Sequence, residues 1–132
     1  MNGWSRRRKK IFVAMPNNGS QEVFFKEIIE PISNKAGYEI LRIKTLNAGV
    51  KVLDRILQKI SKCDVFLAIA TGGNRNVHIE IGVALANKKT SIIISDQPNI
   101  VELFDGYAVT LIDESNDDLL RMKLSQALEN TV

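Results

Sequence analysis

Five short apolar runs alternate along the chain with segments in which apolar residues recur at helical spacing. Residues 11–15 and 65–70 are apolar throughout, which is typical of strands buried on both faces of a sheet. The other runs that predict strands cover residues 38–43, 91–95 and 108–112. Strands that alternate with helices in this way predict an α/β domain with a parallel sheet.

The helical spacing predicts helices over residues 20–36, 50–60, 77–87 and 117–128, and a short helix or turn over 98–104. Ser20 is the expected N-cap of the first helix and Gly37 its stop signal. Pro31 lies inside this helix, where its missing N–H predicts a kink or the start of a new turn.

For five such strands we expect the order 2-1-3-4-5 in a flavodoxin-like or Rossmann-like three-layer α/β/α fold. The winding direction then reverses between strands one and three, and ligands bind at the carboxyl ends of the strands beside this point. Two loops rich in glycine and asparagine follow these strands. The expected binding residues are Pro16, Asn17, Asn18, Gly19 and Ser20 in the first loop, and Gly72, Gly73, Asn74, Arg75 and Asn76 in the second.

Each loop opens a helix and so offers free backbone N–H groups, which suit a phosphate or a ribose. Neither contains the G-x-G-x-x-G or G-x-x-x-x-G-K-[ST] fingerprint, and glycine-rich turns also end strands without binding anything. The argument for a site is that both loops fall at one crevice.

Glu80 is the sharpest candidate for chemistry, because it is the one carboxylate near the start of an otherwise apolar helix. One interpretation is a capping role, since the helix dipole favours an acid there. The other is catalytic: the same position keeps the carboxylate ionised and directs it at the crevice, as attack on an anomeric carbon requires. We expect His78 at the rim or an interface, and Gly82 to allow close approach of the helix to a strand or ligand.

Three other charged residues deserve an expectation of their own. Arg42 ends the second strand at the carboxyl edge, where it suits a phosphate or ribose, although strand ends also carry arginines for no ligand. Asp54, near the start of the second helix, is a candidate second acid, with an exposed helix acid as the alternative. Asp64 begins the third strand at the opposite edge, so we expect a turn residue there.

The composition limits the class of protein. The 132 residues are 45% hydrophobic and 25% charged, as is ordinary for one soluble domain. No apolar run approaches the roughly 20 residues that cross a bilayer, and no signal-peptide pattern is present, so we expect a cytoplasmic protein with no membrane partner. With Cys63 and His78 the only cysteine and histidine, we expect no intramolecular disulfide and no metal site.

The formal net charge of +3 comes from a basic run at residues 6–10. The rest of the chain has a net charge of −2, because five of the cationic side chains belong to this run. We expect residues 1–9 to form a flexible basic tail and residues 10–132 to form the domain. Such a tail holds phosphate backbones non-specifically, but without interleaved aromatic residues we expect no nucleic-acid partner.

Four segments together resemble the nucleoside 2-deoxyribosyltransferase-like superfamily: KIFVAMP at 10–16, the stretch from Ile32 to Arg42, ISKCDV at 60–65 and, above all, NVHIEIGVA at 76–84. The resemblance covers about residues 10–112. It implies that Glu80 is a nucleophile that attacks the sugar C1′ and releases the base, with transfer to another base or to water. It implies a nucleoside or nucleotide substrate, no cofactor, and a homo-oligomer such as a dimer.

The loop before the motif departs from the family pattern. Members that transfer deoxyribose carry an aspartate there, whereas this loop reads TGGNR at 71–75, so the base has no obvious proton donor. Members that hydrolyse nucleoside monophosphates have a serine and a glycine to hold the phosphate, and this chain has Asn74, Arg75 and Asn76. Arg75 is a candidate to neutralise a phosphate instead, or else an exposed loop residue.

Two alternatives to a nucleoside N-glycosidase or deoxyribosyltransferase remain. The missing acid favours a module that binds or senses a nucleotide without turning it over. TIR-like relatives of the superfamily use a similarly placed glutamate to cleave the nicotinamide bond of NAD, which nicotinamide release would reveal.

Overall fold

The computed structural model describes residues 8–16, 19–42, 50–70, 75–95, 109–113 and 116–130. Along the chain the elements are β1 (Lys9–Ala14), α1 (Gly19–Phe24), η2 (Phe25–Ile29), α2 (Glu30–Lys35), β2 (Tyr38–Leu41), α3 (Val50–Lys62), β3 (Val65–Ile69), α4 (Arg75–Ala86), β4 (Thr90–Ser95), β5 (Val109–Asp113) and α5 (Asp117–Asn130). The expected short helix at 98–104 lies outside the described residues.

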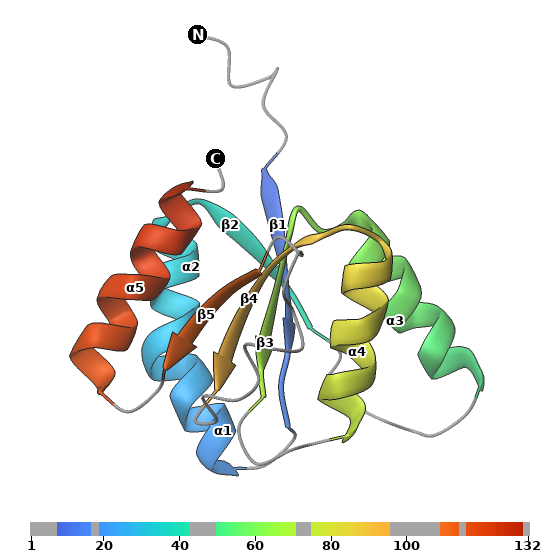
Figure 1. The fold of residues 1–132 in the computed structure, drawn as a ribbon, viewed down its shortest axis with the longest axis horizontal. Coiled ribbons are helices and arrows are strands. Elements are labelled where there is room, and N and C mark those ends of the chain that lie inside the picture. The colour runs from blue at the N-terminus through green and yellow to red at the C-terminus, as the bar shows by residue number, and fades with distance from the viewer. Residues whose placement is uncertain are drawn as a thin grey trace, which may run out of the picture.

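The strands form one sheet in the order β2-β1-β3-β4-β5, and every strand pair is parallel. The predicted α/β class with a parallel sheet is therefore confirmed. Because all strands run the same way, their carboxyl ends lie along a single edge, at the bottom of Figure 1. We call this the carboxyl edge and the opposite one the amino edge.

Helices cover both faces of the sheet (Figure 1), with α2 and α5 on one face and α3 and α4 on the other. The core splits in the same way. One cluster of buried side chains joins alternate strand residues such as Ile11 and Leu67 to η2 and α5. The other joins Phe12 and Phe66 to α3 and α4. Residues 65–70 are all buried, as expected of a strand covered on both faces.

The first helix is continuous from α1 through η2 to α2, with a π-helical turn in the middle. The N–H of Glu30 bonds to the carbonyl of Phe25, five residues back, just before Pro31, which has no N–H to continue an ordinary ladder. The helix ends at Lys35, and Gly37 two residues later has a φ of 88°, the left-handed conformation that glycine adopts easily. The expected disturbance at Pro31 thus takes the form of a π turn, and α1 begins at Gly19, one residue before the expected cap.

Side chains fasten the amino edge. The N–H of Lys10 donates to the Asp64 carboxylate at 2.8 Å, and the N–H of Asp64 donates to the carbonyl of Lys10 at 2.7 Å. The ammonium group of Lys89 donates to the carbonyls of Ser61 and Cys63 at the end of α3, where a cation also suits the helix dipole. Asp64 is therefore a structural residue at the edge far from the predicted site, as expected.

No helix in the described part of the chain has the length and apolar character that a membrane span needs.

Candidate functional site

The packed surface under α3 and α4 changes from large to small side chains as the central strands approach the carboxyl edge. Phe12 of β1 lies beside Phe66 of β3 in the sheet register, and the two rings stack with centroids 5.9 Å apart. Two residues further, the register pair is Ala14 and Ala68, and β3 is followed by the buried Ala70. Alanines leave more room above the strand ends than phenylalanines do.

Glu80 belongs to helix α4, which packs on the same face of the sheet as these alanines. Val77 and Ile81 of α4 are buried in the same cluster as the three alanines, and Glu80 lies between them on the helix, half-buried. The helix begins at Arg75, so Glu80 is its sixth residue and lies in the second turn. Glu80 is near the start of α4, as expected, but it lies beyond the first turn. A capping role, which requires a first-turn position, therefore does not fit.

Burial sets the charge state of Glu80. Desolvation raises the pKa of its carboxyl group from an ordinary 4.5 to about 7, because a low-dielectric surrounding disfavours the ionised form. Within the described part of the chain, no hydrogen bond or ion pair to the carboxylate opposes this shift. The expectation that the helix dipole keeps Glu80 ionised is therefore wrong: near neutral pH both forms are populated.

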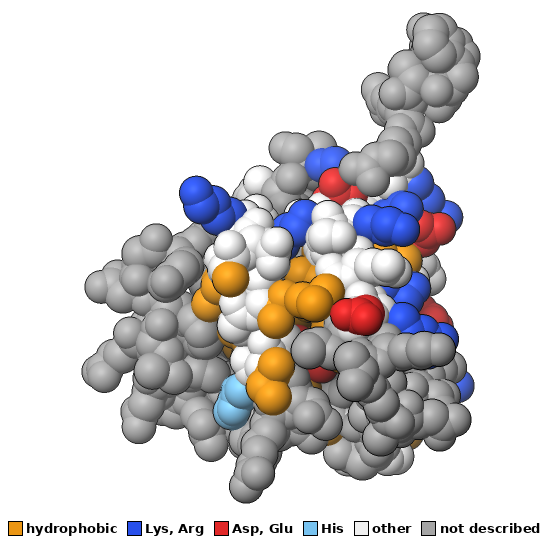
Figure 2. Space-filling model, turned by 90° about the vertical axis from the view of Figure 1, so that its right-hand side faces the viewer, with side chains coloured by type: hydrophobic (Ala, Val, Ile, Leu, Met, Phe, Trp, Pro, Cys, Tyr) orange, Lys and Arg blue, Asp and Glu red, His pale blue; other side chains and the backbone are white. Residues whose placement is uncertain are grey.

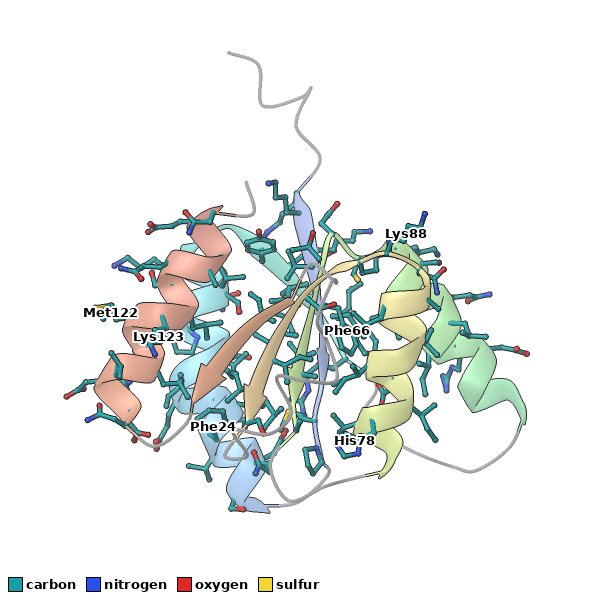
Figure 3. The ribbon with its side chains drawn as sticks, viewed as in Figure 1. Phe24, Phe66, His78, Lys88, Met122 and Lys123 are labelled. Atoms are coloured by element: carbon teal, nitrogen blue, oxygen red, sulfur yellow. The ribbon has the colours of Figure 1, made fainter. Side chains whose placement is uncertain are left out.

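The outer side of α4 carries His78 and Gly82, both exposed. His78 lies near the end of α4 at the carboxyl edge, and Lys88 lies beyond the other end (Figure 3). A Cβ built on Gly82 meets no atom within 4 Å, so close packing against a strand is not the reason for this glycine. The position of His78 agrees with the expected rim.

The first loop is only partly described. Pro16 is buried at the end of β1, while Gly19 and Ser20 are exposed at the start of α1. Asn17 and Asn18 lie outside the described residues. Their role in binding stays a prediction.

Most of the second loop also lies outside the described residues, namely Gly72, Gly73 and Asn74. Arg75 and Asn76 form the first turn of α4. In the sequence this loop follows Ala70 and leads into α4, the helix of Glu80, and the binding role of its residues stays a prediction.

Arg42 has partners of its own. Its guanidinium donates two hydrogen bonds to the Glu22 carboxylate, at 3.1 and 2.7 Å, and lies 4.1 Å from the centroid of the Phe25 ring. Among the described residues, nothing links it to Glu80. Glu22 was missed in the sequence because its partner lies twenty residues away and no local pattern joins the two.

The remaining acidic candidate, Asp54, is exposed on α3. Its role as a second acid stays a prediction. In the described segments, no three His, Cys, Asp or Glu side chains gather as metal ligands would. Ser95 is a further polar residue that sequence reasoning missed: it ends β4 at the carboxyl edge and is buried. The sequence signal that could have identified it is a serine directly after three isoleucines, at the end of a buried strand.

The pKa of Glu80 predicts how stability depends on pH. The folded protein holds the proton up to about pH 7 and the unfolded chain only to about 4.5, so the free energy of unfolding falls as pH rises through this window and then levels off. Glu80→Gln removes the effect. We expect this variant to match the wild type below pH 4.5 and to exceed it at pH 8 by at most about 3 kcal/mol.

Urea denaturation at both pH values measures the difference. Glu27→Gln, at an exposed position on η2, is the matched control and should change the free energy of unfolding by less than about 0.5 kcal/mol. A Glu80→Gln protein that is less stable than the wild type at pH 8 contradicts the desolvated state and supports a capping role.

Comparison with known proteins gives a clear result for the fold. No family model matches the chain. The Lon protease of Wolbachia pipientis subsp. Culex pipiens (strain wPip) is 30% identical over 95 residues, which are 70% of this chain and 11% of that protein. The chain thus spans only about a tenth of the length of this curated relative.

Three solved structures superpose over most of both chains. The CMP N-glycosidase of Clostridium botulinum has a TM-score of 0.69 at 22% identity, covering 89% of this chain and 99% of that one. The 2-deoxyribosyltransferase of Leishmania mexicana has a TM-score of 0.67 at 16% identity, covering 94% of this chain and 99% of that one. The 2-deoxyribosyltransferase of Bacillus psychrosaccharolyticus has a TM-score of 0.63 at 15% identity, covering 85% of this chain and 90% of that one. The chain therefore has the same fold as these three solved structures, as the sequence resemblance implied.

Proposed function

We propose that this protein cleaves or transfers the N-glycosidic bond of a nucleoside or nucleotide, with Glu80 as the nucleophile. The observation that carries the proposal is the half-buried, desolvated carboxyl group of Glu80 on α4, a helix that packs against Ala14 and Ala68 near the carboxyl ends of β1 and β3. This is where the winding of the sheet reverses, and α/β folds bind ligands at such points. The similar solved structures, named as an N-glycosidase and as deoxyribosyltransferases, support the same chemistry.

The proposed reaction proceeds in two displacements. A carboxylate oxygen of Glu80 forms a bond to C1′ as the bond from C1′ to the base nitrogen breaks, and the base leaves with that electron pair and takes up a proton. Water or a second base then attacks C1′ from the opposite side and releases Glu80. Two inversions give overall retention at C1′.

Burial serves this reaction in two ways. It removes hydrating water from the attacking oxygens, and it raises the pKa of Glu80 to about 7, which makes the ionised carboxylate more basic and a better nucleophile. Only the ionised form attacks. The rate is therefore expected to rise with pH through about 7.

The two loops supply the proposed substrate contacts. Asn17, Asn18 and Ser20 of the first and Asn74 and Asn76 of the second offer uncharged hydrogen-bonding groups for a sugar and a base. Arg75 is the proposed partner of a phosphate. Asp54 is proposed as the second acid.

A panel of ribonucleosides, deoxyribonucleosides, their monophosphates and NAD tests this function, with free base or nicotinamide measured by chromatography. We expect release of base by the wild type and a rate at least about a thousandfold lower for Glu80→Gln. The wild-type kcat/KM should rise with an apparent pKa near 7.

Glu27→Gln is the control for an exposed acid and should retain the wild-type rate. Wild-type rates in a Glu80→Gln protein that is folded exclude Glu80 as the nucleophile. Nucleotide binding without release across the panel supports a sensing module, and release of nicotinamide alone supports a TIR-like NAD glycohydrolase.

We further propose that the chain forms a homo-oligomer through the outer side of α4. Ile79 is 57% exposed there, next to the exposed Gly82 and Ala86, and Leu57 of α3 is also exposed. Figure 2 shows hydrophobic side chains gathered over α3 and α4, with the histidine at the lower end of the group. A helix with no charged residue on its outer side between Arg75 and Lys88 suits contact with another protein surface.

Sedimentation velocity tests this assembly. We expect the wild type to sediment as a dimer and Ile79→Ser to sediment as a monomer, because the change removes the most exposed apolar side chain of α4. Leu119→Ser, an exposed leucine on α5, is the matched control and should stay dimeric. A wild type that is monomeric throughout the micromolar range contradicts the assembly.

A further inference from the structure

The contacts of Arg42 form a compact clamp between two elements at the carboxyl edge. Its guanidinium makes a bidentate pair with Glu22, with the shorter contact at 2.7 Å, and stacks on the ring of Phe25 at 4.1 Å. The Arg42 side chain is only 14% exposed and that of Glu22 34%. Paired donors in a planar fork give such an ion pair both geometric precision and strength.

The clamp joins α1 to the end of β2. Glu22 lies in the first turn of α1 and Phe25 is the first residue of η2, while Arg42 directly follows β2. The segment held in this way comes immediately after Pro16 to Gly19, the first of the two proposed substrate loops. A clamp on α1 therefore fixes one end of that loop.

The sheet places the clamp on the face opposite Glu80. Leu41 packs against the cluster under α3 and α4, and Ile40 against the cluster on the other face. Side chains alternate along a strand, so Arg42 shares the side of Ile40, in agreement with its contacts to α1 and η2. Glu80 belongs to α4 on the far side.

A substrate phosphate at Arg42 meets two obstacles. The fork that would receive it already holds a carboxylate, and Glu22 stays nearby as a like charge if it is displaced. Leaving either partner half-buried and unpaired is costly.

We propose that Arg42 is a positioning residue, which fixes α1 and with it the loop after β1 through Glu22, and is not a ligand of a substrate phosphate. The inference rests on the proposed function in one respect: the loop after β1 is taken to bind the substrate. It assigns Glu22 to the working parts of the site, although neither residue touches the reacting atoms.

Glu22→Gln separates the two roles of Arg42 because they predict opposite signs. For a positioning residue, losing the carboxylate loosens α1 and weakens substrate binding. For a phosphate ligand, the same change frees the guanidinium and strengthens binding of phosphorylated substrates. Arg42→Met weakens binding in both cases, but only a phosphate ligand confines the loss to phosphorylated substrates.

The experiment combines two readouts on Arg42→Met, Arg42→Lys and Glu22→Gln. Hydrogen exchange of the backbone amides of residues 19–24 reports on the clamp without turnover, and steady-state kinetics with a nucleoside and its monophosphate report on the loop. Arg121→Met and Glu30→Gln, both at exposed positions, are matched controls. Circular dichroism confirms that each variant is folded.

We expect faster exchange in Glu22→Gln and Arg42→Met and a KM raised about fivefold or more for both substrates. The kcat and the midpoint of the pH–rate profile should not change, since Glu80 keeps its surroundings. Arg42→Lys should have an intermediate exchange rate and KM, because it keeps the charge but loses the planar fork. The double variant with both Glu22→Gln and Arg42→Met should have a KM no higher than that of either single variant, because both changes break the same pair.

Two results overturn the inference: unchanged exchange in both variants, or a lower KM for the monophosphate in Glu22→Gln. If the wild type releases no base, the proposed function fails. In that case hydrogen exchange alone tests the clamp. Faster exchange in both Glu22→Gln and Arg42→Met supports the clamp, and unchanged exchange in both overturns it.

Discussion

Burial of β1 and β3 on both faces is the constraint from which the rest of the structure follows. A strand covered on both sides has room only for apolar side chains. Residues 11–14 and 65–70 are accordingly all apolar and buried. Polar chemistry is thereby excluded from the middle of the sheet and confined to its edges. At the amino edge it serves stability, as in the pairing of Lys10 with Asp64. Near the carboxyl edge β1 and β3 carry Ala14 and Ala68, and α4, the helix of Glu80, packs on the same face.

Glu80 shows the cost of that arrangement. Its second-turn position and partly buried carboxyl group leave it weakly hydrated, and the pKa rises to about 7. An ionised Glu80 therefore lowers the stability of the folded protein at neutral pH, whereas most other acids among the described residues are exposed. Carboxyl groups with pKa values raised by burial cluster at functional sites, which supports the proposed role of Glu80.

Much of the fold follows from local patterns. Fully apolar runs predict the buried strands, glycine predicts the end of the first long helix, and the resemblance carried by the motif around Glu80 implies the fold that the solved structures share. The charge state of Glu80 was not predictable, because it depends on how deeply the folded chain buries the carboxyl group. Nor was the pair of Arg42 with Glu22, since it joins residues that only the folded chain brings together. The position of Arg42 at the carboxyl end of a strand predicts a phosphate or ribose as its partner. In the structure its partner is the carboxylate of Glu22.

The central claim is that the fold itself desolvates Glu80, and a direct titration of this group tests it. Carbon-13 NMR of the side-chain carboxyl carbon, with the signal assigned by its absence in Glu80→Gln, gives the pKa in the folded protein. The account predicts a midpoint near 7. A midpoint near 4.5 would show a fully hydrated carboxylate and contradict the site described above.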